Sequence, residues 1–91
     1  MKRQFYVDFG DRGDVIIELD EKVISVVDDE WRASLYDLHT PEEIAAHIAF
    51  NLVEGSCLSR LDGWADQPDE NARIIENNIN DDLEVNFVKE L

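Results

Sequence analysis

Acidic residues dominate this chain of 91 residues: 22 Asp and Glu stand against 8 Lys and Arg, a formal net charge of −14. That balance excludes generic binding to nucleic acid, because contacts with phosphate groups need Lys and Arg. Apolar residues still make up 44% of the sequence, too many for a disordered acidic tail. We therefore expect residues 1–91 to form a single folded domain, and any partner selected by charge to be basic.

The expected compartment is the cytoplasm. Cys57 is the only cysteine in the sequence, so a framework of intramolecular disulfides is excluded. Residues 1–3 lead directly into a strand pattern rather than into the apolar segment of a signal peptide. No apolar run approaches the length of a membrane span, and we expect no contact with a membrane.

The first predicted element is a β-hairpin formed by residues 4–9 and 14–20. Both segments alternate in period two, the pattern of strands with one buried face. The side chains expected to face inward are Phe5, Val7, Phe9, Val15, Ile17 and Leu19. Gly10 and Gly13 lie between the two segments and can adopt the positive φ angles of a short loop.

Two helices are predicted next. From Val23 to Leu35 the apolar residues recur at intervals of three and four, which indicates one helix with Asp20 as its N-cap. The Val-rich run 22–27 would also fit a strand, and we favour the helix.

The second helix begins at a complete capping box. Thr40 is the N-cap, Pro41 stands at the first helical position and Glu43 at the third. The residues that follow are apolar around most of the circumference, which predicts a helix covered by more than one element. The expected polar stripe consists of Glu43, His47, Asn51 and Glu54.

The chain is expected to close with two strands, at residues 73–76 and 83–88, joined by a turn at 77–82. Leu83, Val85 and Phe87 are the side chains predicted to face inward from the last strand. The predicted order is therefore β-β-α-α-β-β. An α+β fold follows, in which an antiparallel sheet carries two helices packed on one face.

No residue pattern indicates catalysis. His47 falls on the polar stripe, where a solvated histidine is expected, and Cys57 has no partner at the spacing of a nucleophile or a zinc site, so a small buried thiol is expected. The acidic segment 78–84 lacks the glycine that a calcium loop requires. We expect no enzymatic activity, no cofactor and no metal site.

The carboxylates are the remaining candidates for function. A rigid array of carboxylates with aromatic anchors suits the capture of a basic protein surface and, at the limit, imitation of the phosphate track of a nucleic acid. The alternative, that the acid only keeps a small domain in solution, has equal weight. The predicted partner-binding residues are Asp28, Asp29, Glu30 and Trp31, the sheet-face residues Tyr6, Asp8, Glu18 and Glu84, and Trp64.

Five parts of the chain carry a resemblance to a known family, namely residues 2–7, residues 15–20, Trp31, residues 61–64 with 73–75, and residues 83–91. In these stretches the chain resembles a family of small acidic proteins of unknown function encoded by bacteriophages and prophages. The resemblance implies a non-enzymatic accessory protein in the cytoplasm of the host bacterial cell. By analogy with anti-CRISPR proteins, such a protein would bind and inhibit a basic nucleic-acid-handling protein of the host, a CRISPR effector or a nuclease, without contacting nucleic acid directly.

Three other functions stay open. An immunity or antitoxin protein would cover one basic toxin through the same kind of surface. A small-ligand or divalent-ion binding module would use the acidic loops. A structural homodimer would cover Tyr6 and Ile16 on the outer face of the sheet with a second copy.

The net charge of −14 predicts that stability rises with salt. Repulsion between carboxylates destabilises the compact state, and added ions screen it. The free energy of unfolding, measured by urea titration, should increase from very low to moderate sodium chloride. A decrease over that range would contradict the prediction.

Overall fold

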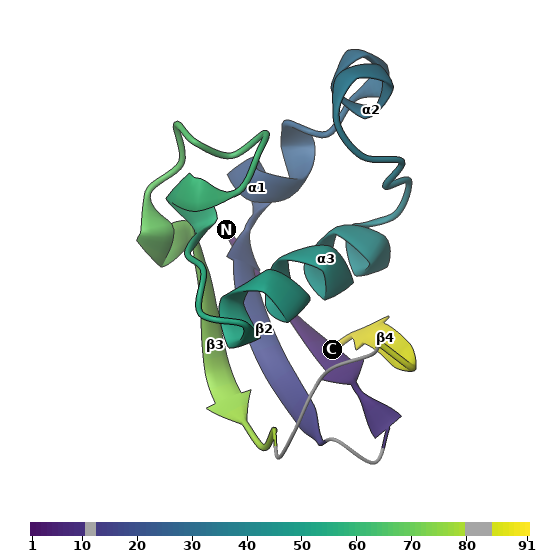
Figure 1. Cartoon of the computed structure of the whole chain (residues 1–91), viewed down its shortest axis with the longest axis vertical. Coiled ribbons are helices and arrows are strands. Elements are labelled where there is room, and N and C mark those ends of the chain that lie inside the picture. Colours follow the sequence, from purple (N-terminus) through teal and green to yellow (C-terminus); the bar gives the residue numbers. More distant parts are fainter. Residues whose placement is uncertain (11–12, 80–84) are drawn as a thin grey trace.

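A four-stranded antiparallel sheet is the centre of the fold in the computed structural model, which describes residues 1–10, 13–79 and 85–91 (Figure 1). Its strand order is β3-β2-β1-β4. The strands are β1 (Lys2–Asp8), β2 (Asp14–Asp20), β3 (Ala72–Asn77) and β4 (Phe87–Glu90). The helices are α1 (Glu21–Ser25), α2 (Asp29–Ser34) and α3 (Pro41–Val53), with 3₁₀ turns at Leu58–Arg60 and Asp69–Asn71. The α+β prediction is confirmed.

The predicted hairpin is confirmed. Strands β1 and β2 pair from Lys2 opposite Asp20 to Asp8 opposite Asp14. Because side chains alternate along a strand, one face of the pair is continuously apolar. The six side chains expected to face inward are all at most 2% exposed, namely Phe5, Val7, Phe9, Val15, Ile17 and Leu19.

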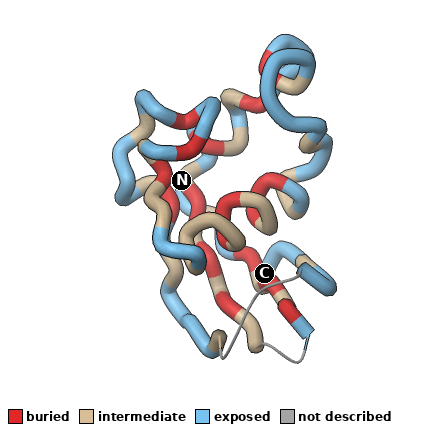
Figure 2. The backbone as a smooth tube through the Cα atoms, viewed as in Figure 1, coloured by how far each residue is buried: buried red, intermediate tan, exposed pale blue. Residues whose placement is uncertain are grey.

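Helix α3 covers this apolar face and contacts all four strands (Figure 1). The capping box is present: the Thr40 hydroxyl accepts from the Glu43 amide, and the Glu43 carboxylate accepts from the Thr40 amide. The helix ends at Val53. Gly55 follows with φ +100°, a conformation that lets the Ser56 amide donate to the Asn51 carbonyl. Buried residues of the helix and the strands form the band of core between them in Figure 2.

The segment 21–35 forms two short helices rather than the single one predicted. Asp20 caps α1 as expected, since its carboxylate accepts from the Lys22 amide. The chain leaves the helix after Ser25, and Asp28 caps a new one by accepting from the Trp31 amide. Asp competes with the helical backbone for its hydrogen bonds, and the Val pair before it is a poor helix former. The element order is therefore β-β-α-α-α-β-β.

The two closing strands do not form a hairpin with each other, which corrects the prediction of a turn joining them. Strand β3 pairs with β2 and carries a bulge, while β4 pairs with β1 at the opposite edge of the sheet. The inward residue of β4 is Val88, opposite Val7, whereas Val85 and Phe87 are 38% and 50% exposed. The prediction therefore assigned the wrong face of this strand to the core, an error of one residue. Leu83 lies outside the described residues.

Two tryptophans attach α2 to the rest of the fold. The Trp31 ring lies 4.9 Å from the Trp64 ring, and its Nε1 donates to the Gly63 carbonyl at 3.3 Å. Trp64 is 1% exposed, and its Nε1 donates to the carbonyl of Val23 in α1 at 2.9 Å. Gly63 has φ +95°, and a Cβ there would stand 2.5 Å from Trp31 Nε1. Only glycine lets the indole lie this close to the backbone.

Alanine at Gly63 should therefore destabilise the fold more than alanine at Gly55. Both positions have positive φ, which costs a residue with a Cβ about 1–2 kcal/mol. A Cβ at Gly55 meets nothing within 4 Å, whereas Gly63→Ala displaces the Trp31 indole, a further cost of about 1–3 kcal/mol. Equal losses in the free energy of unfolding, measured by urea titration, would contradict the Trp31 contact.

Candidate partner-binding surfaces

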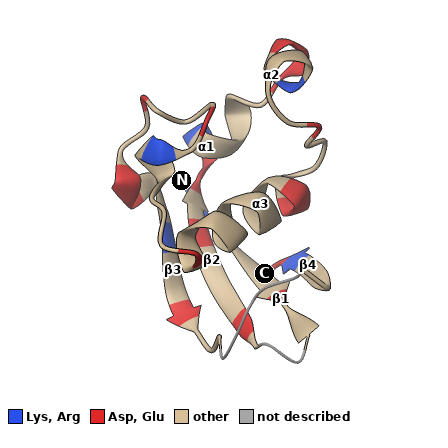
Figure 3. Cartoon of the chain, in the orientation of Figure 1, with Lys and Arg blue, Asp and Glu red and all other residues tan. Residues whose placement is uncertain are grey.

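The predicted partner-binding residues fall on two separate surfaces. Asp28, Asp29 and Glu30 lie in and before α2, which projects from one end of the molecule (Figure 3). Tyr6, Asp8 and Glu18 lie on the face of the sheet opposite α3. The two sets therefore do not form one contact surface. Glu84 lies outside the described residues.

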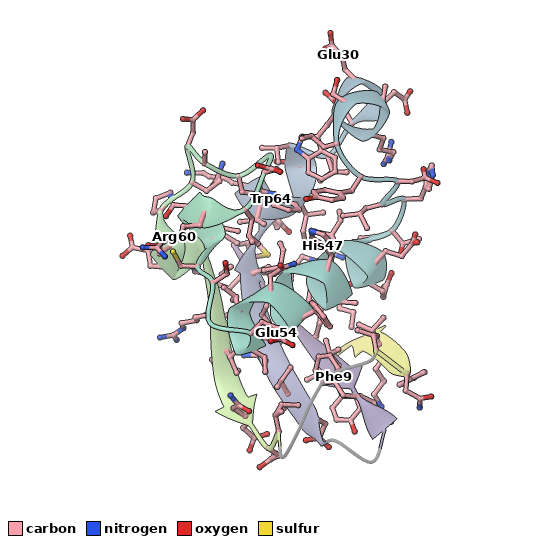
Figure 4. The ribbon with its side chains drawn as sticks, in the orientation of Figure 1. Phe9, Glu30, His47, Glu54, Arg60 and Trp64 are labelled. Carbon is pink, nitrogen blue, oxygen red and sulfur yellow. The ribbon has the colours of Figure 1, made fainter. Side chains whose placement is uncertain are left out.

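The first surface, here called the acidic end, is built on α2. Glu30 is exposed and its side chain points away from the body of the molecule (Figure 4). Asp29 is also exposed and forms an ion pair with Arg32 at 3.0 Å. Asp28 has a structural role as well, because its carboxylate caps the helix. The acidic end comprises Asp28, Asp29, Glu30, Leu35, Tyr36, Asp37 and the neighbouring Asp62.

The two tryptophans predicted as exposed anchors are buried. Trp31 is 9% exposed and Trp64 1%, so both belong to the core and neither presents its ring to a partner. Leu35 and Tyr36, which follow α2 directly, are 39% and 38% exposed. Leu35 was predicted to face inward on a continuous helix. It is instead the C-cap of α2, with φ −125° and ψ −89°.

Arg32 holds this exposed pair in position. Its Nε donates to the Leu38 carbonyl at 2.7 Å while its Nη1 contacts Asp29. The guanidinium thus ties α2 to the segment that follows it. The guanidinium is thus bonded to two groups of its own chain, so little of the Arg32 charge is available to a partner. The carboxylates around it set the sign of the local potential.

His47 is not the solvated helix-face histidine that the sequence predicted. Its ring is half-buried, with the Tyr36 ring centroid at 4.5 Å and the Trp64 ring centroid at 5.9 Å. Figure 4 shows it on the side of α3 that faces the Trp64 segment. Burial among these rings disfavours the charged imidazolium and lowers the pKa of His47. The histidine therefore joins α3 to the acidic end as a neutral aromatic group.

The second surface, here called the open sheet face, carries charges of both signs. Tyr6 Oη donates to the Asp14 carboxylate at 3.0 Å, an interaction that raises the pKa of Tyr6. Glu18 accepts from Gln4 and forms an ion pair with Arg73 at 3.4 Å. Asp8 accepts from the backbone amide of Gly10. The carboxylates predicted to attract a partner here are already engaged within the chain.

Two other polar side chains, Cys57 and Asp69, make local contacts near Ser59. Cys57 is half-buried rather than fully buried, and its Sγ lies 3.7 Å from Ser59 Oγ. Asp69 accepts from the Ser59 amide, which lowers the pKa of Asp69 and fixes the loop. Among the residues described, no group of three or more His, Cys, Asp and Glu side chains is placed to hold a metal ion.

The sequence matches no protein-family model, and comparisons with curated proteins and with solved structures find no significant match. Within the described part of the chain, no helix has the length and apolar character needed to cross a membrane.

Lowering the pH should destabilise the native protein more than a His47→Gln variant. Because the folded-state pKa of His47 is lowered, the unfolded chain takes up the proton first. Its contribution to stability is complete above the unfolded pKa and declines as the pH falls toward the folded value. The loss of unfolding free energy between about pH 7.5 and about pH 5.5, which bracket the ordinary pKa of histidine, should be smaller in the variant.

If His47→Gln and the unsubstituted protein lose equal stability, burial of the His47 ring does not disfavour its protonation.

Proposed function

We propose that this protein is a non-enzymatic binding protein that captures a basic protein surface with its acidic end. The observation that carries the proposal is the exposed pair Leu35 and Tyr36 at the end of α2, with exposed carboxylates at the start of the same helix and at Asp37 next in the chain. Binding surfaces combine an aromatic or aliphatic anchor with a polar rim. Here Tyr36 supplies the anchor, and Asp29, Glu30 and Asp37 supply the rim.

The charge of the acidic end favours a basic partner. Its five carboxylates lie near one arginine that is tied to the chain on both sides. The total charge of −14 adds a long-range field of the same sign. Such a field accelerates encounter with a basic surface, while the apolar contact slows dissociation.

A nucleic-acid-handling protein is the partner class that this surface suits. Proteins that bind nucleic acid carry basic grooves for phosphate groups, and exposed carboxylates would occupy such a groove in place of the phosphates. With the sequence resemblance to small acidic phage proteins, this supports inhibition of a host CRISPR effector or nuclease. An immunity protein that neutralises a basic toxin would use the same physics, and the identity of the captured protein separates the two.

Removing the charge of the acidic end should weaken capture. The variant Asp28→Asn, Asp29→Lys and Glu30→Lys retains an N-cap residue and raises the net charge by five. Used as bait in a bacterial lysate eluted with rising salt, the unsubstituted protein should retain one dominant basic protein that the variant loses. With that partner purified, association should be slower by about tenfold or more in the variant.

The matched control is Glu21→Gln, Glu54→Lys and Glu70→Lys, which changes the net charge equally at exposed positions outside the acidic end. It should retain the partner. If both variants lose it equally, only total charge matters and the acidic end is not the site. If the unsubstituted protein retains only a mixture of basic proteins lost at modest salt, the proposed function is wrong.

A further inference from the structure

The open sheet face is the broad surface that the helices leave uncovered. In Figure 1, α3 crosses the sheet on the near side, and the described residues place no helix against the far side. Side chains that would be buried in a two-sided sheet are half-exposed there: Tyr6 and Ile16 are intermediate and Phe87 is 50% exposed. Tyr6 lies opposite Ile16 on the neighbouring strand, so the centre of this face is apolar.

This face differs from the rest of the molecule in its charge balance. By strand register it carries three of the chain's few cations, Lys2, Arg73 and Lys89, beside five carboxylates. The five are Asp8, Asp14, Glu18, Asp20 and Glu76. Its net charge is therefore −2 on a chain of −14. Two copies that meet here therefore repel each other less than a net charge of −14 spread evenly over the chain would predict.

The central row of the face has opposite charges at its two ends. Register places Glu76 of β3 beside Ile16 of β2, Ile16 beside Tyr6 of β1, and Tyr6 beside Lys89 of β4. The Lys89 ammonium lies 5.9 Å from the centroid of the Tyr6 ring. The row therefore runs from acid through two apolar side chains to base. A row of this kind is complementary to the same row of a second copy rotated by 180°, because acid then faces base at both ends.

We propose that the open sheet face is the twofold interface of a homodimer. A twofold axis in the plane of the interface and parallel to the strands exchanges the two edges of the sheet. It places Ile16 against Tyr6 of the second copy and Glu76 against its Lys89. The same operation sets Lys2 against Asp20 of the second copy. Closed twofold contacts of one self-complementary surface are the commonest form of homo-oligomer.

One like-charge juxtaposition follows from this arrangement, Asp14 against Asp8 of the second copy. Both carboxylates already accept hydrogen bonds within their own chain, Asp14 from Tyr6 and Asn78 and Asp8 from the Gly10 amide. These donors offset part of the repulsion. The acidic ends lie outside the contact, where solvent and ions screen them over about 8–10 Å at physiological salt.

A basic protein is a poorer occupant of this face than a second copy. Lys2, Arg73 and Lys89 would repel it, and Asp20 and Glu18 are already paired with two of them. The acidic end, by contrast, lies beside Arg32, which is already bonded to Asp29 and the Leu38 carbonyl, and His39, which contacts Asp37. The two surfaces thus fit different partners, and the dimer does not depend on the proposed function.

The test uses reversal of the two end charges. Sedimentation of the unsubstituted protein across the micromolar range at physiological salt should show a monomer–dimer equilibrium. Lys89→Glu alone and Glu76→Lys alone should each weaken the dimer by about tenfold or more, because each creates two like-charge contacts. The double variant Glu76→Lys with Lys89→Glu restores the pairing and should recover the dimer.

Both residues are exposed, so each variant should keep the circular dichroism and melting temperature of the folded chain. Ile16→Lys, which places a charge at the centre of the row, should abolish the dimer. A monomer at every concentration, or a dimer indifferent to the single reversals, would overturn the proposal. Failure of the double variant to recover the dimer would overturn the twofold arrangement.

Discussion

The buried indole of Trp64 is the contact on which the helical side of the molecule depends. Its nitrogen satisfies the Val23 carbonyl in α1, and its ring lies against Trp31 of α2 and near His47 of α3. Helices α1 and α2 have five and six residues, too few to be stable on their own in water. They persist because one large aromatic side chain gives both of them, and the longest helix, a common surface.

Much of the fold was predictable from local signals. Period-two alternation identified the hairpin, and Thr40 with Glu43 identified the start of α3, because each pattern acts over a few neighbouring residues. The partners of β3 and β4, and the burial of the tryptophans, depend on contacts between distant segments that periodicity does not encode. At the candidate site, the acids on α2 were found and the exposed Leu35 and Tyr36 were missed. The capping ability of Asp28 was the signal that the helix restarts there, which moves Leu35 out of the helical face.

Charge in this protein is sorted by surface rather than spread evenly. Carboxylates gather at the acidic end, where the one nearby arginine is held by Asp29 and the Leu38 carbonyl. The open sheet face carries three cations beside five carboxylates, and two of the three cations are paired within the chain. With the partner and the dimer proposed above, the acidic end would face a basic protein, and the open sheet face, with a net charge of −2, would face a second copy.

The sheet order has a consequence for how the chain reaches its native state. Strand β1 is an inner strand that pairs with β2 across a short hairpin and with β4 at the far end of the sequence, as in Phe5 opposite Glu90. The bidentate Arg3–Glu90 pair fixes this same junction. During synthesis one edge of β1 therefore stays unpaired until residues 87–90 have left the ribosome. The pairing of β1 with β4 therefore joins residues far apart in the chain, a non-local contact of the kind that slows folding relative to a hairpin alone.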